Sequence, residues 1–143
     1  MAEPFKIDPK LVTLVARRSP QAAAIGLKVL SMDGDSTVME VPWREDLVGD
    51  VQEGVIAGGV VTTLLDHVCG FSVNASGATL STATLDLRID YLRAAAPRAG
   101  VMAQATCYKQ TRTIAFVRGV AYDVSPDDPI AMAQAAFVLQ GAG

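Results

Sequence analysis

The spacing of hydrophobic and polar positions changes several times along the chain, and each change marks a predicted element. Asp8-Pro9 is typical of a helix start, an N-cap followed by proline at the first helical position. Apolar residues at helical spacing follow as far as Ser19-Pro20, where we expect this helix to end. Residues 26–31 and 37–43 are predicted strands, and the turn signal Asp33-Gly34-Asp35 joins them into a β-hairpin.

The longest apolar stretch, Ile56 to Val73, predicts a helix from about Gly58 to Ser72 that ends within 74–77, after an irregular polar loop at 44–54. Apolar residues cover a wide arc of this helix, so we expect other structure to wrap it. The stretch approaches the length of a membrane span, but Asp66 and His67 lie at its middle. An acid there would cost about 3 kcal/mol on insertion scales. The pattern favours a buried helix of a soluble protein with no membrane partner.

The second half of the chain reads as four strands separated by turns. Residues 81–93 alternate, with apolar side chains at odd positions and polar ones at even positions, which is typical of a sheet with one face on a core. The polar positions include Asp86, Arg88 and Asp90, which we interpret as a solvated or subunit-contact face. Further strands are predicted at 101–109, 113–123 and 130–139. The order of elements predicts one α+β domain over residues 1–143, with a helical segment at 1–20 and an antiparallel sheet of five or six strands around one long helix.

Composition narrows the class of partner. The chain has 143 residues, half of them hydrophobic but only 6% aromatic, and a mean hydropathy of +0.31. Its abundant small side chains suit close packing of helix on sheet and of subunit on subunit. A net charge of −3 and a pI near 5.0 indicate neither nucleic acid nor an anionic membrane as the main partner. Residues 1–10 lack the basic start and apolar run of a signal peptide, so we expect a cytoplasmic protein.

Several kinds of chemistry do not fit the residues present. Cys69 and Cys107 have no metal-like spacing and the chain has one histidine, so we expect reduced thiols and no metal or other cofactor. That histidine, His67, directly follows Asp66, and neighbouring helix positions point about 100° apart, which disfavours a Ser-His-acid triad. Gly58-Gly59 lacks the Lys-Ser/Thr ending of a phosphate loop.

The remaining candidates for chemistry are one acid, Asp66, and the exposed backbone N–H groups at the start of the helix. Together they suit acyl transfer. Asp66 could activate water or attack a carbonyl, and backbone N–H groups at Gly58-Gly59 could stabilise the oxyanion. Gly58 and Asp66 are eight residues apart, about 12 Å along one helix. One thioester carbonyl cannot touch both within one subunit. If both residues act, Asp66 must come from a second subunit, which predicts a two-fold dimer with two shared sites.

The pattern Gly54-x-x-Ala57-Gly58-Gly59-x-x-x-x-Leu64-x-Asp66 resembles the helix motif of hotdog-fold thioesterases of the phenylacetate-degradation and 4-hydroxybenzoyl-CoA type. Residues 87–93 resemble the central strand of that family, residues 131–137 resemble its last strand, and the similarity extends from about 25 to 139. The resemblance implies an acyl-CoA thioester hydrolase that forms a homodimer or a homotetramer. It implies Asp66 as nucleophile or general base, the Gly58 N–H as oxyanion donor, and Gly59 as the residue that keeps the helix start open.

Other family positions differ here. The family histidine before the two glycines is Ala57, the amide six positions earlier is Val51 with Gln52 beside it, and the Ser or Thr one turn after the acid is Gly70. A family hydroxyl that helps to place water falls at Thr84, although strict alternation puts Thr84 opposite the apolar strand face. Altered support by Gln52 or His67, slow catalysis, and acyl-CoA binding without turnover all remain open.

Coenzyme A carries phosphates, so basic side chains should meet it. Arg93, Lys109, Arg112 and Arg118 are the candidates, and we assign Arg93 and Arg112 to substrate binding together with Ala57, Gln52 and Gly59. Two other activities compete with hydrolysis. A hotdog dehydratase or hydratase would pair a histidine with the acid, and a non-catalytic acyl-CoA-binding protein would explain the missing polar groups.

Overall fold

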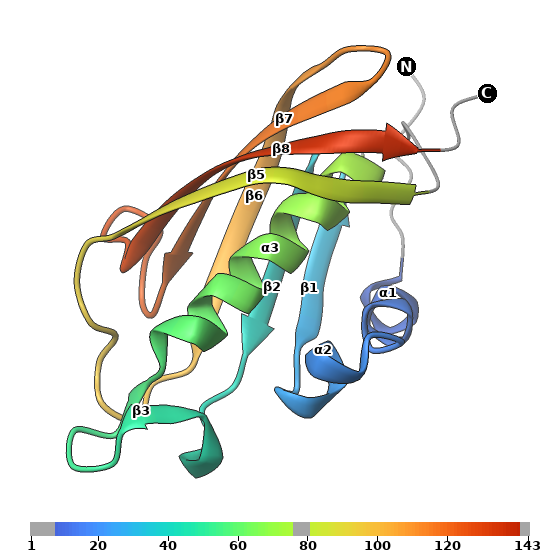
Figure 1. The fold of residues 1–143 in the computed structure, drawn as a ribbon. Helices are drawn as coiled ribbons and strands as arrows, with labels where there is room; N and C mark the ends of the chain where they lie inside the picture. The colour runs from blue at the N-terminus through green and yellow to red at the C-terminus, as the bar shows by residue number, and fades with distance from the viewer. Residues whose placement is uncertain (1–7, 76–80, 141–143) are drawn as a thin grey trace.

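A long helix lies across one face of an antiparallel sheet in the computed structural model, which describes residues 8–75 and 81–140 (Figure 1). The helix, α3, spans Gly58–Ala75. The sheet has six strands in the order β1-β2-β6-β7-β8-β5, and this arrangement confirms the predicted α+β architecture. The strands are β1 (Lys28–Asp33), β2 (Ser36–Val41), β5 (Ser81–Tyr91), β6 (Val101–Gln110), β7 (Ile114–Tyr122) and β8 (Ala131–Gln140).

The N-terminal helix forms where the sequence predicts it. Helix α1 spans Pro9–Ala16, and the Asp8 side chain caps it by accepting a hydrogen bond from the Lys10 backbone N–H. Ser19-Pro20 ends this helical stretch as expected but also starts a short second helix, α2 (Pro20–Ala24), because Pro suits the first position of a helix that Ser19 caps. The first seven residues of the predicted 1–20 segment lie outside the described residues, as do 76–77 of the segment predicted to end α3.

The loop predicted at 44–54 is more ordered than expected. It contains a 3-10 turn, η1 (Glu45–Leu47), and the strand β3 (Val48–Asp50), which pairs with β4 (Val55–Ile56) in a small hairpin. Strands of two and three residues are too short to show an alternating pattern in the sequence. Gly54 adopts a positive φ of 67° at the turn between them, a conformation that favours glycine. The hairpin leads directly into α3.

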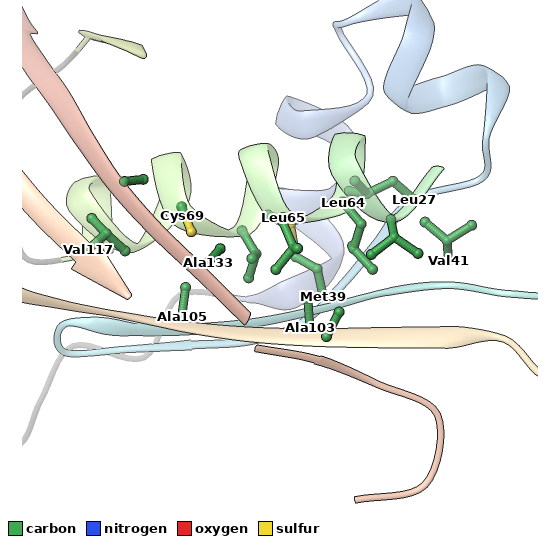
Figure 2. Close-up of a cluster of buried hydrophobic side chains, with 14 of the residues drawn as sticks. Leu27, Met39, Val41, Leu64, Leu65, Cys69, Ala103, Ala105, Val117 and Ala133 are labelled. Carbon is green, nitrogen blue, oxygen red and sulfur yellow. The ribbon is translucent and has the colours of Figure 1, made fainter. Parts of the chain in front are cut away.

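One face of α3 forms the core with the sheet (Figure 2). Alanines such as Ala103 and Ala105 on β6 and Ala133 on β8 are small enough to let the helix lie close to the strands. The buried helix residues are Val61, Leu64, Leu65, Val68, Cys69, Ser72 and Val73. The opposite face, with Asp66 and His67, is only half-buried, so the expected wrapping is incomplete within one chain. None of the helices in the described part of the chain is long and apolar enough to cross a membrane.

Candidate active site

Asp66 lies on the half-open face of α3, where a hydroxyl from the sheet holds it. Thr84 on β5 donates a hydrogen bond of 2.8 Å from Oγ1 to Asp66 Oδ1. Among the described residues this is the one hydrogen bond that the Asp66 side chain receives. The second carboxylate oxygen is therefore available to a water molecule or a substrate.

A β-bulge makes this contact possible. The pairing of β5 with β8 runs from Thr84 opposite Phe137 to Asp86 opposite Ala136, so Leu85 is an extra residue without a partner. The bulge reverses which positions face the helix, and Leu85 is 58% exposed although its position predicts a core residue. Before the bulge, Thr84 faces the helix, and after it Leu87 and Ile89 pack on the core. The expectation that Thr84 lies opposite the apolar face was wrong for this reason.

A pocket of about 170 Å³ opens beside Asp66. It lies between α3 and the ends of β5 and β8, and its lining residues combine aromatic walls with polar groups: Asp66, His67, Gly70, Phe71, Asn74, Thr82, Thr84 and Phe137. Gly70 also lines the pocket, and a Cβ added there would lie 3.4 Å from Phe137 Cε1, so a larger residue would take up part of this space. The pocket can therefore hold a small organic group next to the carboxylate.

The start of α3 is held from two sides. The Tyr91 hydroxyl on β5 donates a hydrogen bond of 3.2 Å to the Gly58 carbonyl and also forms a hydrogen bond with Thr62 Oγ1. On the other side the Ala57 N–H donates to the Leu47 carbonyl, and a Cβ added at Gly49 would lie 3.1 Å from Ala57 Cα. These contacts fix where the first N–H groups of the helix point.

Packing within one chain does not require glycine at the start of α3. A Cβ at Gly58 would meet only Tyr91 Cε1, at an ordinary 3.7 Å, and a Cβ at Gly59 would meet nothing within 4 Å. Both glycines are exposed. Close packing of the helix on its own sheet therefore does not explain them, and their bare backbone is open to approach from outside the chain.

The remaining positions that the resemblance singled out are peripheral in one chain. Val51 is 86% exposed, and Gln52 is exposed in the β3–β4 turn, where its backbone N–H donates to Asp50 Oδ1. His67 lines the pocket, and its Nδ1 lies 2.9 Å from the Thr63 carbonyl. Because a carbonyl only accepts, Nδ1 carries the proton, and Nε2 is the acceptor of the neutral ring.

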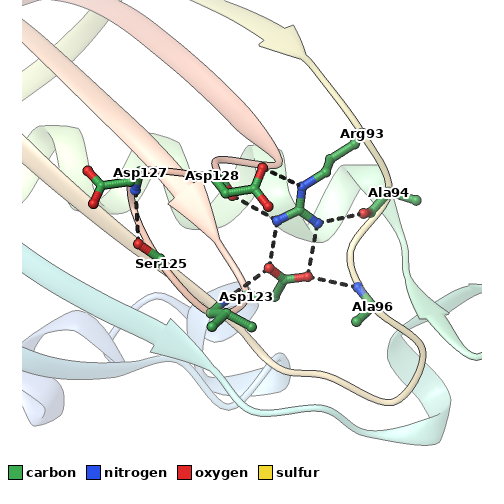
Figure 3. Close-up of polar contacts among 8 residues, drawn as sticks. Arg93, Ala94, Ala96, Asp123, Ser125, Asp127 and Asp128 are labelled. Carbon is green, nitrogen blue, oxygen red and sulfur yellow. Dashed lines mark hydrogen bonds and ion pairs between the residues drawn. The ribbon is translucent and has the colours of Figure 1, made fainter.

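Arg93 lies in a network of ion pairs at the end of β5 (Figure 3). Its guanidinium forms a two-pronged pair with Asp123, with distances of 2.7 and 3.1 Å, and also contacts Asp128 at 3.3 Å. The Asp123 side chain is 3% exposed. The hydrogen bonds from Arg93 and from the Ala96 N–H hold the pKa of the Asp123 carboxyl well below its usual range. A phosphate that binds Arg93 would have to compete with two carboxylates.

The other basic candidates lie in the β6–β7 hairpin. Lys109 and Arg112 are exposed, and the Arg118 guanidinium lies over the Tyr108 ring, 4.4 Å from its centre. On the outer face of the sheet, Arg88 and Asp90 form an exposed ion pair of 3.5 Å, which adds little stability. None of the four basic candidates, Arg93, Lys109, Arg112 and Arg118, lines the pocket beside Asp66.

Both cysteines are free and buried. Burial, with a smaller contribution from the charge of Asp66, raises the pKa of the Cys69 thiol to about 12. Burial also raises the pKa of Cys107. Both thiols are protonated at neutral pH, so neither is a nucleophile. The described residues contain no cluster of three or more His, Cys, Asp or Glu side chains that could hold a metal ion.

Comparison with known proteins identifies the class. The sequence profile of the thioesterase superfamily matches residues 53–130. A solved Pseudomonas aeruginosa protein is 33% identical, covers 91% of this chain and 97% of its own, and superimposes with a TM-score of 0.82. The phenylacetic acid degradation protein PaaI of Thermus thermophilus, solved as an N33D mutant, is 26% identical over 85% of this chain and 99% of its own, with a TM-score of 0.73.

The PaaI protein of Escherichia coli, from the phenylacetic acid degradation operon, is 17% identical over 92% of each chain and shares the fold with a TM-score of 0.79. No curated protein sequence matches the chain significantly. The chain belongs to the thioesterase superfamily and has the hotdog fold of the PaaI-type proteins.

Proposed function

We propose that this protein hydrolyses small or medium acyl-CoA thioesters to free acid and CoA, with Asp66 as the reacting carboxylate. The observation that carries the proposal is the hydrogen bond from Thr84 to Asp66, two residues that line the same pocket of about 170 Å³. The bond fixes one carboxylate oxygen, and the other has no hydrogen-bond partner among the described residues. Membership of the thioesterase superfamily supports the same class of reaction.

The chemistry needs one carboxylate and one oxyanion donor. As a general base, Asp66 takes a proton from water while the water oxygen attacks the thioester carbonyl. The carbonyl oxygen becomes an oxyanion that accepts a hydrogen bond from the Gly58 N–H, and the C–S bond then breaks to release CoA as its thiolate. As a nucleophile, Asp66 would instead form an anhydride that water cleaves. The final products, free acid and CoA, are the same by both routes.

We place the two groups of each site in different subunits. Gly58 and Asp66 lie at positions on α3 that are about 12 Å apart along the helix axis. Strand β5, which carries Thr84, ends the sheet among the described residues and so presents unpaired backbone groups to a second chain. A second copy related by a two-fold axis at this edge would bring its own Gly58 towards Asp66 and would complete two equivalent sites.

A hydratase or dehydratase is the alternative that one observation favours. His67 lines the same pocket as Asp66, and its Nε2 is the free acceptor of the ring, so an acid and a base could act on one ligand. His67 directly follows Asp66 in the helix and does not lie at the start of α3, which is why hydrolysis is the preferred proposal.

The test is thiol release from a panel of short, medium and aromatic acyl-CoA thioesters, with crotonyl-CoA hydration followed in parallel by absorbance. Thiol release that depends on enzyme concentration supports the proposal. Hydration of crotonyl-CoA without thiol release would replace it with the alternative. Thermal stabilisation by acyl-CoA without turnover of any thioester would instead indicate a binding protein.

A further inference from the structure

The first two N–H groups of α3 have no acceptor among the described residues. The N–H groups of Val60 and Val61 both donate to the Ala57 carbonyl, at 3.0 and 3.4 Å. Those of Gly58 and Gly59 come too early in the helix for an intrahelical bond, and no other described group accepts from them. Free N–H groups at a helix start can stabilise an oxyanion when their direction is fixed.

Two hydroxyls hold the peptide unit between Gly58 and Gly59. The Tyr91 hydroxyl lies 3.2 Å from the Gly58 carbonyl oxygen, the Thr62 hydroxyl lies 3.1 Å from the same oxygen, and the two hydroxyls contact each other. Each hydroxyl has one proton to donate, so the three contacts share two protons. In every arrangement that keeps both protons among these three oxygens, at least one hydroxyl donates to the carbonyl.

The direction of the Gly58 carbonyl determines the direction of the next N–H group. A peptide unit is planar and trans, so its carbonyl and its N–H point in opposite directions. A bond that anchors the Gly58 carbonyl therefore also anchors the Gly59 N–H. Glycine gives this unit little stiffness of its own, and a Cβ at Gly59 would meet nothing within 4 Å. The Tyr91 hydroxyl thus supplies a constraint that the two glycines lack.

Strand β5 contacts both groups that the proposed chemistry needs. Thr84 on this strand donates to Asp66, and Tyr91 on the same strand reaches the start of α3. Thr62 belongs to α3 itself, so of the two hydroxyls that of Tyr91 is the one that ties the helix start to the sheet. Bonds from one strand therefore set the positions of the carboxylate and of the first N–H groups of the helix.

We propose that Tyr91 is a positioning residue that aims the N–H groups of Gly58 and Gly59 at the oxyanion by holding the peptide unit between them. The inference rests on the proposed hydrolysis. The full negative charge on the substrate oxygen develops as the reaction proceeds and is absent from the bound thioester. Loss of the Tyr91 hydroxyl should therefore slow the reaction and leave substrate binding almost unchanged.

The first experiment compares kcat and KM of Tyr91→Phe with those of the wild-type protein, by thiol release from the acyl-CoA that the wild type hydrolyses fastest. Phenylalanine keeps the ring and removes only the hydroxyl. We expect kcat to fall about tenfold, the effect of one orienting hydrogen bond, while KM changes by less than about twofold. Tyr108→Phe, the same change at an exposed ring on β6, is the matched control and should leave both constants unchanged.

The second experiment measures the order parameters of the Gly58 and Gly59 amides by NMR relaxation, and it needs no substrate. Both values should be about 0.85 in the wild-type protein, as in rigid backbone, and Tyr91→Phe should lower both towards about 0.6. The order parameters of Val61 and Leu64, which are buried residues of the same helix, should not change.

Equal kcat in Tyr91→Phe and the wild-type protein would overturn the inference while leaving the proposed hydrolysis intact. A rise in KM with unchanged kcat would also overturn it, because Tyr91 would then act in substrate binding. Unchanged order parameters at Gly58 and Gly59 would overturn it even if kcat falls. Absence of thiol release from every acyl-CoA would instead count against the proposed function, and the order parameters would still decide whether Tyr91 holds the helix start.

Discussion

Thr84 reaches Asp66 because strand β5 gains one residue, Leu85, between the part that faces the pocket and the part that packs on the core. Without the bulge, Thr84 and the apolar residues Leu87 and Ile89 could not share one face of the strand, because strand side chains alternate. The bulge therefore lets one strand turn polar residues such as Thr84 towards the pocket before it, and apolar residues such as Leu87 towards the core after it. Bulges of this kind are common next to active sites.

Removing the Thr84 hydroxyl tests its role in holding Asp66. We expect Thr84→Val to lower kcat about tenfold, because the carboxylate loses the bond that orients it, a loss of about 1.4 kcal/mol in transition-state stabilisation. The measurement is steady-state thiol release, with Thr113→Val in an exposed loop as the matched control. Unchanged kcat in Thr84→Val would show that Asp66 needs no such support.

Replacing Gly58 with proline removes the proposed oxyanion donor while keeping the helix. Gly58 is the first residue of α3, where proline is well tolerated, and Ala57 before it is already non-helical. We expect Gly58→Pro to lower kcat about 100-fold, in line with the loss of one oxyanion donor. Gly58→Ala retains the N–H and is the matched control, since its Cβ would meet only Tyr91 at 3.7 Å. Equal activity of the two variants would show that another group binds the oxyanion.

Mixing two inactive variants tests whether the site is shared. In a dimer of one Asp66→Asn chain and one Gly58→Pro chain, one site carries both changes and the other carries neither, if each site takes its two groups from different subunits. Random mixing by co-expression or refolding should then restore about a quarter of wild-type activity, because half of the dimers are mixed and each has one intact site. If both groups act within one subunit, mixing restores nothing.

The Arg93–Asp123 pair predicts a pH dependence of stability. The pKa of Asp123 is lowered in the folded protein, so its contribution to stability is full above the ordinary carboxyl value of about 3.9 and is lost as the pH falls towards the lowered pKa. Asp123→Asn should lower the melting temperature by about 5 °C at neutral pH. The difference from wild type should shrink as the pH falls below about 4. A constant difference from neutral pH to pH 3 would contradict this account of the pair.

Much of the fold could be predicted because its signals are local and periodic. The apolar run at 56–73, the alternation along β5 and the turn residues of the β1–β2 hairpin each determine an element on their own. The β3–β4 hairpin was missed because strands of two and three residues leave no period. The Leu85 bulge was missed because strand pairing, which is not local, determines where an extra residue is accommodated.

The candidate site was predictable only in part, for a related reason. Asp66 and the glycines stand out because a carboxylate and bare backbone are costly within an apolar helix. Thr84 could be named from the family resemblance, but its contact with Asp66 depends on the bulge. Tyr91 gave no signal in the sequence, because it continues the apolar alternation of β5 and its contact with the Gly58 carbonyl depends on how the strand lies beside α3.

The most direct measurement is kcat for thiol release by Asp66→Asn against wild type, on whichever acyl-CoA the wild-type protein turns over fastest. Asparagine keeps the shape of the side chain and can still accept the hydrogen bond from Thr84, but it cannot take a proton from water or act as the nucleophile. We predict that kcat falls at least 100-fold while the melting temperature changes little. A variant that folds and retains wild-type kcat would contradict the central claim that Asp66 is the reacting carboxylate.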